Sequence, residues 1–150
     1  YGELYECMPF DNRLVKLSIA GAELRRVLET HLSHDRHGIL SLGGFSAAAS
    51  CHEGRLRVTL TDKLGRSIAD GEQLVLVTSD YLATGGDGLF APIALDRARV
   101  HAVDGVLVRD ALAAELSKLG RIDPAAPRWF DAKRPRLALP SRRPVVCTPP

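Results

Sequence analysis

The chain has little net charge, few aromatic residues and no long hydrophobic run. Its 20 lysines and arginines nearly balance 18 aspartates and glutamates, which gives a formal net charge of +2 over 150 residues. A protein that binds the backbone of a nucleic acid polymer needs a basic stripe along one face, so the composition argues against that class. The apolar runs are far too short to cross a bilayer, so we expect no membrane span.

Cysteine is also scarce. The chain holds three cysteines, Cys7, Cys51 and Cys147, and an odd number cannot all pair within one chain. At most one internal disulfide is therefore possible, and the wide spacing is not that of a zinc site. The cysteines leave the cellular compartment undecided.

Glycine is concentrated in one short segment, which we call the glycine loop. Residues 82–88, Leu-Ala-Thr-Gly-Gly-Asp-Gly, place three glycines around one carboxylate, soon after the apolar run at 74–77. Glycine permits positive φ and close approach of a ligand, while Asp87 supplies two acceptor oxygens. That pairing suits two neighbouring hydroxyl groups, although the segment taken alone is more typical of a simple tight turn.

A second motif lies near the start. Residues 8–12, Met-Pro-Phe-Asp-Asn, precede an alternating apolar segment, a turn at Gly21 and a helical segment that ends near Glu29. This order resembles the C-terminal domain of the 5'-nucleotidase family, where a Pro-Phe-x-Asn turn leads into a strand, a turn and a helix ending in Leu-Glu. The family, which includes UDP-sugar hydrolases and 2',3'-cyclic nucleotide phosphodiesterases, has the later signature Asn-Phe-Leu-Ala-x-Gly-Gly-Asp-Gly, similar to residues 80–88. The resemblance covers about residues 1–120.

The resemblance implies a nucleoside site. In the family, the aromatic residues of the two motifs hold the nucleobase and the Asp binds ribose hydroxyls, and the matching residues here are Phe10, Tyr81 and Asp87. Two ring faces stack on a base with about 1–3 kcal/mol per base and little preference among bases. Asp80 replaces the usual Asn and adds a negative charge beside the site. The predicted substrate-binding set is completed by Asn12, Gly44, Gly85 and Gly86.

The catalytic motifs of the family are missing. Its N-terminal metallophosphoesterase domain holds two divalent metal ions that activate water, and no Gly-Asn-His-Glu or Gly-His-x-His run is present here. The family's Asn-Gly-Gly-x-Arg segment is absent too, and residue 1 is a tyrosine. We therefore expect a fragment that begins inside the C-terminal domain, with no catalytic residue and no metal or other cofactor of its own. Its expected partners are a nucleotide or nucleoside and the N-terminal domain of the same protein.

Family members are mostly periplasmic, cell-surface or secreted, so the resemblance implies one of those locations. The alternative to a hydrolase domain is a stand-alone nucleoside-binding or interaction module, and a third reading is a structural remnant that binds nothing.

The hydrophobic pattern predicts an α+β domain. Alternating apolar residues predict strands at 15–19 and 56–60, and the runs at 39–45 and 74–77 predict two more. Apolar spacing predicts helices at 21–32 and 112–119. We expect a mixed sheet covered by these two main helices, with the ligand site at the strand ends. Residues 1–122 would form the domain, and residues 123–150 a Pro-rich irregular tail anchored by Trp129 and Phe130; partner binding is the alternative role for Trp129.

Several other clusters favour structural roles. The histidines at 31, 34 and 37 fit a helix C-terminus without any metal, because imidazoles there complement the helix dipole. Cys51 and His52 are neighbours whose side chains point apart, which argues against a catalytic pair. Arg143 is expected to be solvated, whereas Arg13 is the best local candidate for contact with a phosphate or base.

Overall fold

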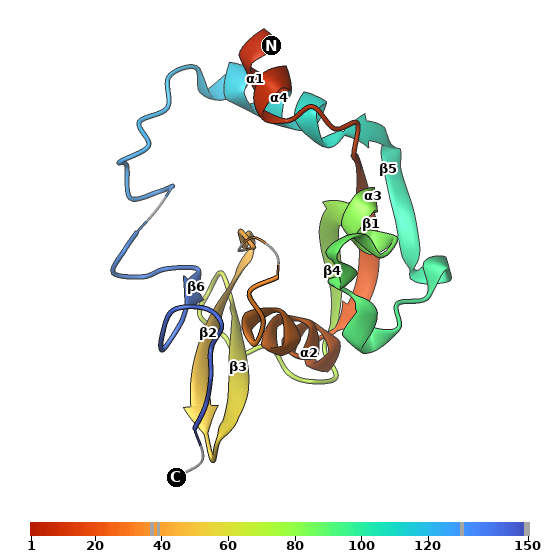
Figure 1. Cartoon of the computed structure of the whole chain (residues 1–150). Helices are drawn as coiled ribbons and strands as arrows, with labels where there is room; N and C mark the ends of the chain where they lie inside the picture. The colour runs from red at the N-terminus through yellow and green to blue at the C-terminus, as the bar shows by residue number, and fades with distance from the viewer. Residues whose placement is uncertain (37, 39, 130, 149–150) are drawn as a thin grey trace.

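The strands of the chain form two three-stranded sheets. The computed structural model describes residues 1–36, 38, 40–129 and 131–148. The first sheet is antiparallel, in the order β4-β1-β5, and consists of β1 (Arg13–Ala20), β4 (Gln73–Ser79) and β5 (Val100–Leu107). The second has the order β3-β2-β6, with β2 (Phe45–His52) antiparallel to β3 (Arg55–Asp62) and parallel to β6 (Leu137–Ala138) (Figure 1).

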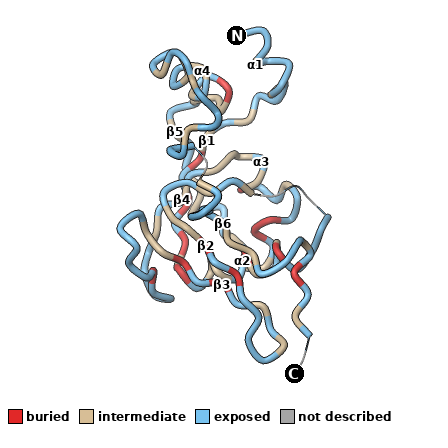
Figure 2. Tube along the Cα trace, turned by 90° about the vertical axis from the view of Figure 1, so that its left-hand side faces the viewer, coloured by how far each residue is buried: buried red, intermediate tan, exposed pale blue. Residues whose placement is uncertain are grey.

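Helix α2 (Gly21–Leu32) packs its apolar face into the core between the two sheets. Its buried residues are Gly21, Leu24, Val27, Leu28 and Leu32, as the spacing predicts. They share one core with buried residues of both sheets, notably Leu17, Ile19, Val58 and Leu60 (Figure 2). Gly21 lies so close to the backbone of Ala69 that a Cβ atom there would overlap the Ala69 carbonyl.

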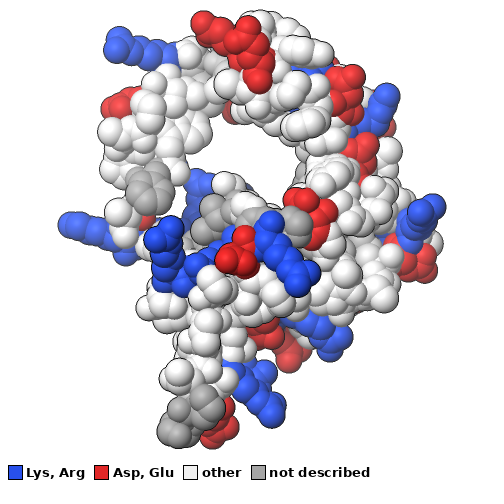
Figure 3. Space-filling view, viewed as in Figure 1, with Lys and Arg blue, Asp and Glu red and all other residues white. Residues whose placement is uncertain are grey.

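Two further helices lie at the far end of the first sheet. α1 (Gly2–Cys7) packs on α4 (Val108–Leu119), which continues directly from β5. Figure 1 shows this pair away from α2, and Figure 3 shows an opening between it and the rest of the molecule. The short helix α3 (Asp80–Ala83) follows β4, and three 3-10 turns follow: η1 (Gly86–Gly88), η2 (Ala91–Ile93) and η3 (Arg97–Arg99).

The α+β class is confirmed, and the structure refines the arrangement of its elements. The strands divide into two sheets because α2 is inserted between β1 and the β2–β3 hairpin. Among the described strands, only those of the second sheet combine parallel and antiparallel pairing. Of the two predicted helices, α2 covers sheet faces, whereas α4 packs on α1 at the end of β5.

The strand predicted at 39–45 is wrong for the described residues 40–43, which are irregular; residue 39 lies outside the described residues. Gly44 takes φ +87°, which ends the irregular segment, and β2 begins only at Phe45. Sequence patterns also missed β5, because its half-buried residues, Val100, Val103, Val106 and Leu107, do not alternate with exposed ones.

The tail returns from α4 to the second sheet and is fixed there at several points. β6 pairs with β2, Cys147 forms a disulfide with Cys51, and buried Val145 donates its N–H to the carbonyl of Leu32 at 2.9 Å. Arg143 is not solvated as predicted, because it donates to the carbonyls of His34 and Gly38. Phe130, predicted as an anchor, lies outside the described residues. The domain boundary at 122 stays a prediction.

Candidate functional site

The glycine loop includes the last two residues of α3 and continues beyond the end of that helix. The Ser79 hydroxyl caps α3 by accepting from the N–H of Leu82 at 3.3 Å. Gly85 has φ +111°, and Asp87 has φ +54°, a left-handed conformation that Asp tolerates better than most residues. The two residues therefore turn the chain tightly and leave the Asp87 side chain on the loop's surface.

Tyr81 and Asp87 contact each other across this loop. The Tyr81 hydroxyl donates to Oδ1 of Asp87 at 2.9 Å. This hydrogen bond, together with the charge of the Asp87 carboxylate, raises the pKa of Tyr81. Tyr81 is nevertheless 49% exposed. The pair presents an aromatic ring and a carboxylate side by side to solvent.

Gly86 lies against Tyr81 and permits this arrangement. A Cβ atom at Gly86 would lie 2.5 Å from Cε1 of the Tyr81 ring and 2.5 Å from the Tyr81 carbonyl oxygen. Real side chains do not approach so closely, so the contact requires glycine. Gly86 thus has a packing role within the predicted set.

Asp80 links the two sequence motifs, which the sequence had not indicated. Its Oδ1 accepts from the backbone N–H of Arg13 at 2.9 Å and from the backbone N–H of Tyr81 at 2.8 Å. The side chain therefore ties the start of β1, just after the Pro-Phe turn, to the start of α3. Sequence reasoning treated Asp80 only as an extra charge, but its carboxylate is held by backbone donors and positions Tyr81.

The Pro-Phe turn is held by Arg109, a second residue that sequence reasoning missed. Arg109 is only 4% exposed and donates to the carbonyls of Met8 and Phe10, at 2.9 and 3.2 Å, and to Oδ1 of Asp11 at 2.7 Å. Hydrogen bonds with the Tyr1 hydroxyl and with Asp11 raise the pKa of Arg109. A charged residue at the start of a helix gives no signal in the sequence that it is buried.

The remaining predicted residues divide between two places. The carbonyl of Asn12 accepts from the N–H of Val108 at 2.8 Å, and Phe10 is 69% exposed at the same turn. Within the described residues no hydrogen bond or ring contact joins Phe10 to Tyr81; the connection runs through Arg13 and Asp80. Gly44 lies elsewhere, on a cavity that it shares with Lys63 and Arg136. The binding roles of all seven residues stay predictions.

Asp87 also lines a cavity of about 220 Å³. It is lined by residues from the end of α2, from the loop after it, from the glycine loop and from the tail: Thr30, His31, His34, Arg36, Asp87, Gly88, Leu89 and Arg143. Asp87 thus accepts from the exposed Tyr81 and also lines a cavity that includes Arg36 and Arg143.

Four other sequence hypotheses can be compared with the structure. Among the described residues, which leave out His37, no group of three or more His, Cys, Asp or Glu side chains could hold a metal ion. Cys51 is in a disulfide and is no nucleophile. Arg13, the candidate ligand contact, donates from its guanidinium to the carbonyl of Gly105 at 3.1 Å. No helix in the described part of the chain is long and apolar enough to cross a membrane.

The fold and the site define an α+β domain with a surface loop built to present a ring and a carboxylate. Residues 1–94 match the family described as 5'-nucleotidase, C-terminal domain. The chain belongs to this family, as the two sequence motifs indicate.

Solved structures of nucleotidases share the fold. The 5'-nucleotidase precursor of Thermus thermophilus matches with a TM-score of 0.70 at 22% identity, over 92% of this chain and 27% of that chain. The NAD nucleotidase of Haemophilus influenzae matches with a TM-score of 0.62 at 20% identity, over 81% of this chain and 25% of that chain. This chain therefore spans about a quarter of the length of these proteins. A comparison with curated protein sequences found no match.

Proposed function

We propose that this chain is the nucleotide-recognition domain of a 5'-nucleotidase-like hydrolase of phosphoric esters. The observation that carries the proposal is the pairing of the exposed Tyr81 ring with the Asp87 carboxylate, joined by a 2.9 Å hydrogen bond. An aromatic face beside a carboxylate matches the two halves of a nucleoside, a flat base and a sugar with neighbouring hydroxyls.

Each side chain has a role in this proposal. The base stacks on Tyr81, with Phe10 as the second ring, and ribose hydroxyls donate to Asp87. A carboxylate accepts more than one hydrogen bond, so the ribose can bind beside the Tyr81 hydroxyl or in its place. Asp80 and Arg109 act as positioning residues, because they hold the backbones of the two motifs through hydrogen bonds.

Hydrolysis in this proposal takes place in an N-terminal metallophosphoesterase domain of the longer protein, where two divalent metal ions supply the activated water. Recognition of the nucleoside by this domain positions the phosphoester for that attack, since binding far from the reacting bond lowers the entropy cost of orienting it. The disulfide between Cys51 and Cys147 supports a periplasmic, cell-surface or secreted location, because disulfides persist in oxidising compartments.

The test is a titration of adenosine and then uridine into the isotope-labelled chain, followed by amide chemical shifts. We expect saturable shifts confined to the Pro-Phe turn and the glycine loop, at millimolar affinity or better, and their loss in Asp87→Asn. Glu53→Gln, an exposed carboxylate in the β2–β3 turn, is the matched control and should leave them unchanged. Shifts that persist in Asp87→Asn would contradict the proposed site.

A separate assay distinguishes the hydrolase domain from a stand-alone binding module. The longer protein, supplied with a divalent metal, should release phosphate from AMP. A module without hydrolytic function would give the same adenosine shifts but no phosphate release.

A further inference from the structure

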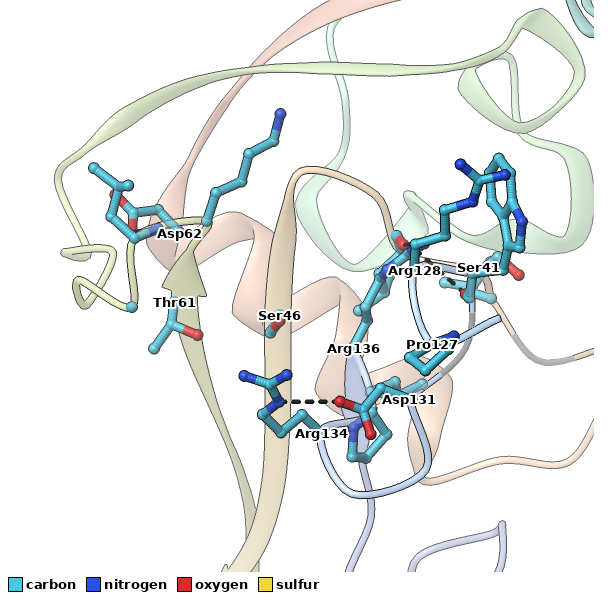
Figure 4. A pocket seen from close by; sticks show the side chains of 17 residues that line it. Ser41, Ser46, Thr61, Asp62, Pro127, Arg128, Asp131, Arg134 and Arg136 are labelled. Carbon is cyan, nitrogen blue, oxygen red and sulfur yellow. Dashed lines mark hydrogen bonds and ion pairs between the residues drawn. The ribbon is translucent and has the colours of Figure 1, made fainter. Parts of the chain in front are cut away.

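One large cavity in the described residues lies away from the glycine loop. Its volume is about 780 Å³, within the range of roughly 300–1,000 Å³ that is usual for small-molecule sites. Three separate segments line it: residues 40–42 with Ser46, the end of β3 with its turn at 61–65, and residues 127–129, 131 and 134–137 of the tail. Figure 4 shows Thr61 and Asp62 on one side and Pro127 and Arg128 across from them. Phe10, Tyr81 and Asp87 do not line this cavity.

The charges around this cavity are not balanced. Its two carboxylates are already paired, Asp62 with Arg66 at 2.7 Å and Asp131 with Arg134 at 3.0 Å. Lys63, Arg128 and Arg136 also line the cavity, and in the part of the chain that the structure describes none of them pairs with a carboxylate. Three cations that face one hollow without counter-charges favour an anionic ligand.

Lys63 and Arg136 lie where a second cavity adjoins the first. A shallower cavity of about 380 Å³ is lined by residues 43–46 together with Lys63 and Arg136. Ser46, Lys63 and Arg136 line both cavities, so a hydroxyl, an ammonium and a guanidinium border the region that we call their junction. Arg136 is oriented there by donating to the carbonyl of Leu42 at 3.1 Å. Such a group of donors matches the oxygens of a phosphate.

An aromatic ring lies in another part of the same cavity. Trp129 is the single tryptophan of the chain and is 36% exposed, and the guanidinium of Arg128 lies 4.9 Å from its ring centroid. An indole with a cation over it offers a stacking surface for a flat ring. The cavity therefore combines an anion subsite with an aromatic subsite.

We propose that this cavity is a second ligand site, which binds an organic anion of the nucleoside monophosphate class. The phosphate lies at the junction formed by Ser46, Lys63 and Arg136, and the base lies against Trp129. Gly44 lines the shallower of the two cavities, and its predicted role in admitting a ligand to the base site stays a prediction. The site stands independently of Asp87.

The intrinsic fluorescence of Trp129 tests the proposal directly, because it is the only indole in the chain. AMP, adenosine and inorganic phosphate are titrated separately, with excitation at the red edge of the indole absorption, where adenine absorbs little. AMP should quench the emission saturably in the millimolar range or below. Inorganic phosphate should compete with AMP, and adenosine should bind much more weakly than AMP.

Three variants test whether the quenching comes from AMP bound in this cavity. Lys63→Glu, at an exposed turn position, should weaken AMP binding by about tenfold or more, because an attractive charge becomes repulsive. Arg121→Glu makes the same change at an exposed position outside the cavity and should have little effect. Asp87→Asn should leave the quenching intact, which separates this site from the nucleoside site.

The proposal is overturned if AMP causes no saturable quenching, if adenosine matches AMP, or if Lys63→Glu behaves as Arg121→Glu does. Loss of quenching in Asp87→Asn would also overturn it, since the signal would then come from the glycine loop. Amide shifts of Ser46 and Lys63 on addition of AMP provide the second measurement, and their absence would count against the site.

Discussion

The Asp80 carboxylate accepts the backbone N–H of Arg13 at 2.9 Å, across 67 positions of the sequence. The same oxygen accepts the N–H of Tyr81. One side chain thus joins the turn that presents Phe10 to the helix that presents Tyr81. The relative placement of the two motifs depends on this contact more than on any direct contact between the two rings.

Replacement of Asp80 should therefore disturb both stability and binding. Asp80→Ala removes the acceptor for two backbone donors, and we expect the free energy of unfolding to fall by about 1–3 kcal/mol. Asp80→Asn keeps one acceptor oxygen, restores the usual residue of the family motif and should cost much less. Urea denaturation measures the change in stability, and the adenosine concentration at half-saturation measures the change in binding. Equal stability of the Ala variant and the wild type would show that the contact is unimportant.

Gly86→Ala should strain the glycine loop. Its added methyl group would meet the ring and the carbonyl of Tyr81 at 2.5 Å, and overpacking of this kind costs about 1–3 kcal/mol. Because the Tyr81 ring must move to relieve the clash, adenosine binding should weaken as well. Gly71→Ala is the matched control, since no atom lies within 4 Å of a Cβ atom there. Similar melting temperatures for the two variants would contradict the packing role of Gly86.

Sequence patterns predicted the elements whose residues repeat regularly. The spacing of Leu24, Val27 and Leu28 predicted α2, and strict alternation predicted β1 and β3, because burial of one face imposes those periods. β5 was missed because half of its residues are exposed without regular alternation and its pairing with β1 is irregular. No local pattern in the sequence indicates the division into two sheets or the return of the tail to the second sheet.

The candidate site was predictable only in part. Tyr81, Gly86 and Asp87 lie within one short segment, so their proximity follows from the sequence. The roles of Asp80 and Arg109 depend on backbone groups that are distant along the chain. Every residue has a backbone N–H or carbonyl group, so a hydrogen bond to the backbone requires no particular partner residue. No sequence motif therefore predicts these hydrogen bonds. Gly44 lines a cavity with Lys63 and Arg136, and its role in base binding stays a prediction.

The ion pair between Glu23 and Arg99 should make stability depend on pH. Arg99 donates to both carboxylate oxygens, at 2.6 and 2.9 Å, and this pairing, with the N–H of Ala20, lowers the pKa of Glu23 from 4.5 to about 2. A lowered folded-state pKa means that the stabilisation is complete above about pH 4.5 and is lost as the pH falls toward 2.

Glu23→Gln should therefore reduce the free energy of unfolding by about 1–3 kcal/mol at neutral pH, allowing for partial exposure of the pair. The difference from the wild type should shrink as the pH falls below 4.5. Urea denaturation at a series of pH values measures this difference in the free energy of unfolding. A difference that stays constant down to about pH 3 would contradict the assignment.

The disulfide should contribute to stability by holding the tail on the second sheet. It joins residues 96 positions apart, and closing so long a loop restricts the unfolded chain, with a typical effect of about 2–4 kcal/mol. Cys147→Ser should lower the free energy of unfolding by that amount, whereas Cys7→Ser, at an exposed free cysteine, should not. Thiol titration of the unfolded, unreduced chain should find one reactive thiol; three would show that the pair does not form.

The central claim is that Phe10, Tyr81 and Asp87 together bind one nucleoside. Intermolecular nuclear Overhauser effects between bound adenosine and the labelled chain test it most directly. The account predicts contacts from the adenine protons to the rings of both Phe10 and Tyr81, and contacts from the ribose protons to the backbone amide of Asp87. Adenine contacts to neither ring, with the ribose distant from the glycine loop, would contradict the account.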